Sequence, residues 1–158
     1  TVLSENESKA KLMMNLDRGG KKPRKDIAKW SEVKDYFSYF YPMYYQKDYT
    51  LPENIAPSDA EKILTEYLKV YNEEDEKDIW FQKIKELCEP LGFTPNVKEY
   101  KQNPEKYKGH VGDVSTVIRI AVTSRTNTPD LCAIMKILGK DETESRIADA
   151  INYYKEVK

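Results

Sequence analysis

The sequence predicts an all-α, multihelical protein built from two packed helical subdomains. Apolar residues recur with helical spacing in several stretches, and no run alternates as a β-strand would. The clearest case is residues 108–139, where two short amphipathic helices are joined by a polar turn. The acidic segment 72–78 interrupts the helical pattern. We therefore expect one subdomain in residues 1–75 and the other in residues 76–158.

In the first half of the chain, a helix is predicted over residues 30–41 and ends at Pro42. A loop at residues 17–29 precedes it and holds six basic residues. These are Arg18, Lys21, Lys22, Arg24, Lys25 and Lys29. The loop is either a solvated surface segment or a patch that faces phosphates. A capping pair, Ser58 and Glu61, then predicts the start of a helix that reaches Tyr71.

In the second half, a helix is predicted over residues 79–91, followed by an irregular basic connection over residues 93–108. A single helical turn is expected at Asn103-Pro104 within that connection. The next helix, residues 113–124, has one apolar face and carries Arg119 on the opposite side. A last helix is predicted from Asp141, which forms a capping box with Glu144, to about residue 157.

The helix expected over residues 129–138 has signals at both ends. Thr128 is its predicted N-cap, Pro129 occupies a first position that tolerates proline, and Leu131 begins its buried stripe. The turn before it, residues 125–127, is polar and expected on the surface. Arg119 and this helix start are therefore expected to face the same solvent region, which is the first place to look for function.

Composition excludes several classes of protein. The 158 residues are 39% apolar and 34% charged, with a net charge of −1, which does not by itself indicate nucleic-acid binding. No apolar run reaches membrane length and no signal peptide is visible, so we expect a cytoplasmic protein without membrane contact. The first residue is Thr rather than Met, which favours a piece of a longer chain.

No catalytic or metal site is apparent. Cys88 and Cys132 lie on apolar helical faces and are expected to be small buried side chains in a reducing compartment rather than a disulfide. One histidine, His110, and two cysteines lack the spacing of zinc ligands, and His110 is expected to cap or orient its loop. Phosphate-binding loops, nucleophile elbows and HExxH motifs are missing from the sequence. The chain is therefore expected to bind a partner rather than to transform one.

The stretch KGHVGDVSTVIRIAVTSRTNTPDLCAIMKILGK, residues 108–140, resembles the C-terminal anticodon-binding region of bacterial glutamyl-tRNA synthetases, which are class I enzymes. The matching parts are the glycine-containing approach 109–114, the helix end 119–124, Thr128-Pro129 and the closing segment 134–140. KPRKDIAKW, residues 22–30, resembles the junction in the family's earlier helical subdomain. Ser124 departs from the glycine that the family often has, with only a slight expected effect on the turn.

The resemblance implies a partner and a division of labour. The partner would be the anticodon stem-loop of glutamate tRNA, bound by a monomeric enzyme that does not bind DNA. The family's ATP-dependent loading of glutamate, with Mg²⁺, would belong to a catalytic domain outside this sequence, because neither of its two ATP-binding motifs occurs here. This chain would itself carry no cofactor and no catalytic residue.

The resemblance also implies roles for individual residues. Arg119 would read the middle anticodon base, and Thr128, Pro129 and Leu131 would receive the first and middle bases. Arg24 would read the third base. Contacts with the tRNA backbone would come from further basic residues: Lys21, Lys22, Lys25, Lys108 and Arg125.

Alternatives remain open at this point. Arg119 is compatible with a surface salt bridge, and Leu131 with a place in the core. The two helices joined by a short turn also fit a helix-turn-helix DNA-binding module, although the second helix has only one basic residue, Lys136. A third possibility is a protein-interaction domain that uses the tyrosine-rich region between residues 36 and 49.

Overall fold

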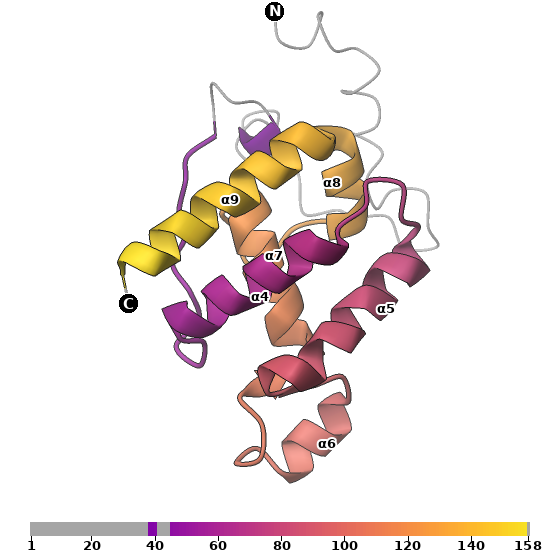
Figure 1. Cartoon of the computed structure of the whole chain (residues 1–158), viewed down its shortest axis with the longest axis vertical. Helices are drawn as coiled ribbons and strands as arrows, with labels where there is room; N and C mark the ends of the chain where they lie inside the picture. The colour runs from indigo at the N-terminus through magenta and orange to yellow at the C-terminus, as the bar shows by residue number, and fades with distance from the viewer. Residues whose placement is uncertain (1–37, 41–44, 158) are drawn as a thin grey trace, which may run out of the picture.

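The computed structural model describes residues 38–40 and 45–157, which form six α-helices connected by short segments (Figure 1). The α-helices are α4 (Pro57–Val70), α5 (Lys77–Cys88), α6 (Val97–Gln102), α7 (Val111–Thr123), α8 (Leu131–Leu138) and α9 (Lys140–Glu156). The short elements are the 3₁₀ helices η1 (Ser38–Phe40) and η2 (Glu89–Leu91) and the strands β1 (Phe93–Thr94) and β2 (Gly109–His110). The prediction of an all-α fold is confirmed. Within the described ranges, no helix is long and apolar enough to cross a bilayer.

The core lies between α4, α7 and α9. Figure 1 shows α9 running alongside α4, with α7 behind them, and all three contact one another. The buried side chains form one apolar cluster that extends from Tyr39 to Tyr154. Helices from both sides of residue 75 therefore contribute to this core. The expected division into subdomains at that residue stays a prediction.

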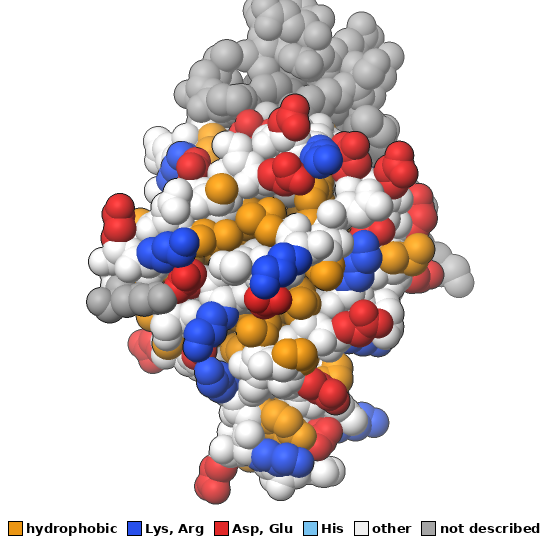
Figure 2. Space-filling model, viewed as in Figure 1, with side chains coloured by type: hydrophobic (Ala, Val, Ile, Leu, Met, Phe, Trp, Pro, Cys, Tyr) orange, Lys and Arg blue, Asp and Glu red, His pale blue; other side chains and the backbone are white. Residues whose placement is uncertain are grey.

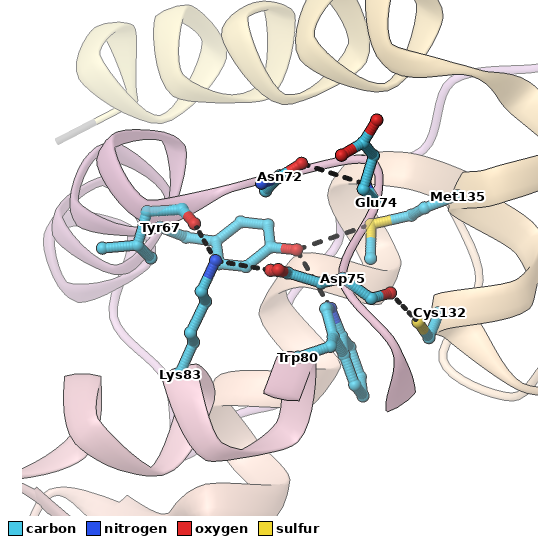
Figure 3. Close-up of polar contacts among 9 residues, drawn as sticks. Tyr67, Asn72, Glu74, Asp75, Trp80, Lys83, Cys132 and Met135 are labelled. Carbon is cyan, nitrogen blue, oxygen red and sulfur yellow. Dashed lines mark hydrogen bonds and ion pairs between the residues drawn. The ribbon is translucent and has the colours of Figure 1, made fainter. Parts of the chain in front are cut away.

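The acidic segment between α4 and α5 is anchored by hydrogen bonds (Figure 3). Lys83 Nζ donates to the Asp75 carboxylate at 2.5 Å and to the Val70 carbonyl at 2.9 Å. Beneath the segment, Trp80 Nε1 donates to the Tyr67 hydroxyl at 3.0 Å (Figure 3). That hydroxyl in turn donates to the Met135 sulfur at 3.7 Å. This part of the chain therefore ties α4, α5 and α8 together.

The predicted caps of α4 and α9 are wrong. The helix expected from Ser58 begins at Pro57, and no side chain caps it. Proline at the first position is already set for a helix, so no cap from Ser58 is needed. The helix expected from Asp141 begins at Lys140, directly after Gly139. Gly139, with a φ of 86°, is the only residue between α8 and α9, so the connection leaves no room for a capping side chain.

The connection at residues 93–108 is more regular than predicted. Its first and last parts pair as parallel strands, with Phe93 opposite Gly109. Helix α6 begins at Val97, before the turn expected at Asn103-Pro104, and Asn96 caps it by accepting from the backbone of the second and third helical residues. None of its residues is buried, so α6 lacks the apolar periodicity by which the other helices were predicted.

The close approach of β1 and β2 predicts a cost for any side chain at Gly109. A Cβ added there would lie 2.4 Å from Asp113 Oδ2 and 3.0 Å from the ring of Phe93. Gly109→Ala should therefore lower the free energy of unfolding by about 1–3 kcal/mol, the usual cost of overpacking. Urea denaturation followed by circular dichroism measures it. Glu105→Ala, at an exposed position in the same connection, is the control, and equal effects of the two changes would contradict the prediction.

Candidate nucleic-acid interface

The turn between α7 and α8, residues 124–130, is the most exposed part of the stretch that the sequence singled out. Thr126 and Asn127 are exposed and Arg125 is half-buried, which confirms the expected polar surface turn. It begins at Ser124, whose φ of 57° lies in the left-handed region. Glycine adopts this conformation without strain and serine does not, so the departure from glycine expected at this position puts strain on the turn.

Helix α7 carries the turn and is fixed at its start by His110. The imidazole Nδ1 accepts from the Gly112 N–H at 2.9 Å, and the Asp113 carboxylate accepts from the His110 N–H at 2.9 Å. This reciprocal capping confirms His110 as a cap, although α7 begins two residues before the predicted start. The buried face of the helix includes Val117 and Ile118, so the half-buried Arg119 lies at the edge of the apolar face.

The end of α7 is held by a buried arginine from α9. Arg146 is 2% exposed, and its Nη1 donates to the Val122 carbonyl at 2.8 Å. Its Nε donates to Glu142 at 2.7 Å, and its guanidinium lies 4.0 Å from the centre of the Tyr45 ring. The Tyr45 hydroxyl is 2.8 Å from Ser124 Oγ. Burial raises the pKa of the Tyr45 phenol, so this group is neutral near pH 7.

The start of α8 differs from the prediction. Its N-cap is Asp130, whose carboxylate accepts from the Ala133 N–H at 3.3 Å, rather than Thr128. The Thr128 hydroxyl instead donates to the Pro129 carbonyl at 2.9 Å, which removes it from the capping position. Asp130 also forms an ion pair with Lys77 at 2.8 Å. A carboxylate already occupies the start of α8. This helix start therefore favours hydrogen-bond donors of a ligand over a phosphate.

The predicted site residues fall into three groups. Arg119 lies on α7 about one and a half turns before Ser124, and the Thr123 hydroxyl donates to its carbonyl at 2.8 Å. Thr128 and Pro129 follow the exposed tip of the turn but are themselves buried. Leu131 is 1% exposed and belongs to the core, so its predicted packing against a base is not possible in this conformation.

The predicted backbone contacts are separated in space. Arg125 lies at the turn, where its Nη2 donates to Ser38 Oγ at 3.2 Å. Lys108 lies at the opposite end of α7, about 20 Å away for a helix of this length, and pairs with Asp59 at 2.7 Å. The other three, Lys21, Lys22 and Lys25, lie outside the described residues, and so does Arg24, the predicted reader of the third base.

The two cysteines behave as expected. Cys88 and Cys132 are both buried and free. Burial raises the pKa of the Cys88 thiol to about 11 and also raises the pKa of Cys132. Both thiols are therefore protonated near neutral pH and are poor nucleophiles.

The structure does not favour a helix-turn-helix reader of DNA. Half of α8 is buried in the core: Leu131, Cys132, Ile134 and Met135. Its one basic residue, Lys136, pairs with Glu76 at 3.3 Å. A recognition helix must expose a face that enters the major groove, and α8 does not. On the face of α9, α4 and α5 in Figure 2, basic and acidic side chains are intermixed, so that face has no patch of one sign.

Comparison with known proteins shows the family of this chain. Residues 21–151 match the family described as the anticodon binding domain. The chain belongs to the anticodon-binding domain family. It is 41% identical over 150 residues to a glutamate–tRNA ligase of Clostridium perfringens (strain 13 / Type A), covering 92% of this chain and 28% of that protein. The predicted resemblance is therefore confirmed.

Further relatives carry the same name. A glutamate–tRNA ligase of Acetivibrio thermocellus is 38% identical over 146 residues, with 92% of this chain and 27% of that protein covered. One of Sorangium cellulosum is 38% identical over 140 residues, with 87% and 24% covered. The anticodon-binding chain thus spans about a quarter of the length of the curated relatives it matches.

Three residues at the turn were not assigned a role from the sequence: Tyr45, Asp130 and Arg146. Aspartate is among the residues preferred at helix N-caps, so Asp130 carried a usable signal. Arg146 offered a weaker one, since an arginine four residues after Glu142 in a helix usually indicates an exposed pair. Tyr45 gave no local signal, because its partner Ser124 is 79 residues away.

Proposed function

We propose that this chain binds the anticodon loop of glutamate tRNA as the anticodon-reading part of a glutamate–tRNA ligase. The observation that carries the proposal is the family match over residues 21–151, together with relatives of one name. The exposed, polar α7–α8 turn supports it, because sequence-specific RNA recognition targets unstacked bases in loops. The chain would act as a monomer in the cytoplasm.

Within this proposal, Arg119 reads the middle anticodon base and Arg24 the third base. Thr128 and Pro129 line the place where the first and middle bases enter, and Leu131 supports that place from the core. The tRNA backbone is contacted by Arg125 and Lys108, together with Lys21, Lys22 and Lys25. A guanidinium suits base edges because its paired donors match two acceptors at once.

Activation of glutamate lies outside this chain in the same proposal. ATP and Mg²⁺ would be held by a catalytic domain, and no residue here is assigned to that chemistry. Across the described part of the chain, no group of three or more His, Cys, Asp or Glu side chains is placed to hold a metal ion.

Arg119→Ala tests the assignment. We expect it to weaken binding of an RNA hairpin carrying the glutamate anticodon by about 1–3 kcal/mol, the scale of one good contact between a side chain and a base edge. The same variant should bind a hairpin with a changed middle base about as well as wild-type protein does. Arg119 does not make its contact with that base even in the wild-type complex. Filter binding with both hairpins measures the difference.

The control is Lys98→Ala, which removes an exposed cation from α6, far from the turn. This change should weaken binding of both hairpins slightly and to the same extent. Equal losses for both hairpins with Arg119→Ala would show that Arg119 contributes charge and does not read a base.

A further inference from the structure

We propose that Tyr45 and Arg146 are positioning residues that hold the α7–α8 turn in the conformation that reads the anticodon. This inference rests on the proposed function. Arg146, at 2% exposed, is not available to RNA, so its effect must pass through the turn.

The first step concerns the backbone at the end of α7. The last carbonyls of a helix have no partner within the helix. Arg146 Nη1 supplies one to Val122, two residues before the turn, at 2.8 Å. A cation at this end of a helix is also favoured by the helix dipole. Arg146 therefore fixes where α7 stops.

The second step concerns Ser124. Its φ of 57° lies in the left-handed region, which is strained for a residue with a side chain and persists only where the surroundings hold it. Its hydroxyl lies 2.8 Å from the Tyr45 hydroxyl, and the Tyr45 ring lies against the Arg146 guanidinium at 4.0 Å. Arg146 and Tyr45 thus form a chain of contacts that ends on the strained residue.

The third step concerns what this residue controls. Ser124 sets the direction in which the chain leaves α7, and Arg125, Thr126 and Asn127 follow it. The Arg125 N–H bonds back to Thr123 Oγ1 at 3.2 Å, so the same conformation also orients Arg125. If Ser124 relaxed to a negative φ, the exposed tip of the turn would point elsewhere.

A buried arginine is a costly way to fill space. Apolar residues of similar volume are often as stable as a buried ion pair or more so, and specificity of conformation is one reason for keeping charges inside. Here the Arg146 Nη2 is buried without a hydrogen-bond partner among the described residues, which adds to that cost. Arg146 contacts Glu142 on its own helix, the Val122 carbonyl at the end of α7 and the Tyr45 ring, which itself contacts Ser124 at the turn.

The test is Tyr45→Phe, which keeps the ring against the guanidinium and removes only the hydroxyl that contacts Ser124. If the turn then adopts the reading conformation about one tenth of the time, affinity for the glutamate-anticodon hairpin falls about tenfold. Affinity for a hairpin with a changed anticodon should stay the same. The selectivity, which is the affinity for the glutamate-anticodon hairpin divided by that for the changed hairpin, should therefore fall. Both are measured with the 158-residue chain, well below its melting temperature.

The matched control is Tyr49→Phe. The Tyr49 hydroxyl is also buried, but it has no hydrogen-bond partner within the described residues. Its removal should leave the selectivity unchanged. If Tyr49→Phe also lowered the affinity for the glutamate-anticodon hairpin relative to the changed hairpin, the assignment to Tyr45 would be overturned. Loss of any tyrosine hydroxyl would then be enough to cause the effect.

A rescue variant separates positioning from general destabilisation. The double variant Tyr45→Phe/Ser124→Gly should recover most of the preference for the glutamate-anticodon hairpin over the changed hairpin, because glycine adopts a φ near 57° without strain. If wild-type protein fails to distinguish the two hairpins, the proposed function is wrong. If wild-type protein distinguishes them but Tyr45→Phe keeps the selectivity, or if glycine gives no recovery, the function stands and the positioning role is overturned.

Discussion

Arg146→Ala should lower the free energy of unfolding by about 2–4 kcal/mol, because it deletes a large buried side chain and leaves a buried carbonyl without its donor. The change leaves the Val122 carbonyl without its donor and Glu142 without its counter-ion. It also empties the space beside the Tyr45 ring. Urea denaturation followed by circular dichroism gives the value directly.

Two further variants define the cause. Arg146→Met fills most of the same space with an apolar chain, so it should cost clearly less than alanine if the emptied volume matters. Lys155→Ala, at an exposed position on the same helix, should stay within about 0.5 kcal/mol of wild type. A loss below about 1 kcal/mol for Arg146→Ala would mean that its contacts are not important for stability.

Trp80→Ala should lower the free energy of unfolding by about 3–5 kcal/mol, the usual range for a large aromatic residue in a core. Trp80 is 7% exposed, and its indole N–H is the donor to the buried Tyr67 hydroxyl (Figure 3). Alanine removes the ring and this donor together. Thermal unfolding monitored by circular dichroism and urea denaturation should agree on the size of the loss.

The neighbouring residue provides the matched control. Phe81 follows Trp80 on α5 but is 37% exposed, so Phe81→Ala should cost less than about 1 kcal/mol. Trp80→Phe should fall between the two, because it keeps much of the ring volume and loses the donor to Tyr67. Similar costs for Trp80→Ala and Phe81→Ala would show that α5 does not pack as described.

Helices with a long apolar stripe were predictable from the sequence alone. The stripe through Ile63, Leu64 and Tyr67 predicted α4, and the stripe through Val117 and Ile118 predicted α7. Both start within two residues of the predicted position, because burial of one face fixes where such a helix lies. Helix α6 has no buried face, so its only signal was the Asn96 cap.

Caps and turns were less predictable, because they depend on neighbours that are remote in sequence. Threonine is a residue type favoured at N-caps, which is why Thr128 was predicted. Asp130, two residues later, takes that role and pairs with Lys77 from α5. Leu131 was predicted for both the buried stripe and the base contact, and the structure gives it to the core. Amphipathic spacing indicates burial reliably, whereas contact with a ligand depends on what remains exposed.

The candidate site was predicted in part. Sequence pattern and resemblance drew attention to Arg119 and to the polar turn, and the exposed turn is confirmed. The contacts that support the turn were beyond reach, since Arg146 acts on a carbonyl 24 residues away. No local periodicity records such a pairing. Whether Arg24 shares the ligand with this turn stays a prediction.

The pairing of α4 with α9 has a consequence for synthesis of the protein. The two helices are neighbours in the core but are separated by more than half of the described chain. On a translating ribosome, α4 and α7 emerge before α9, which packs against both, so part of their apolar surface stays uncovered until residues 140–156 have followed. The Val122 carbonyl at the end of α7 also waits for Arg146, so with the positioning role proposed above the α7–α8 turn would reach its reading conformation only after α9 has docked.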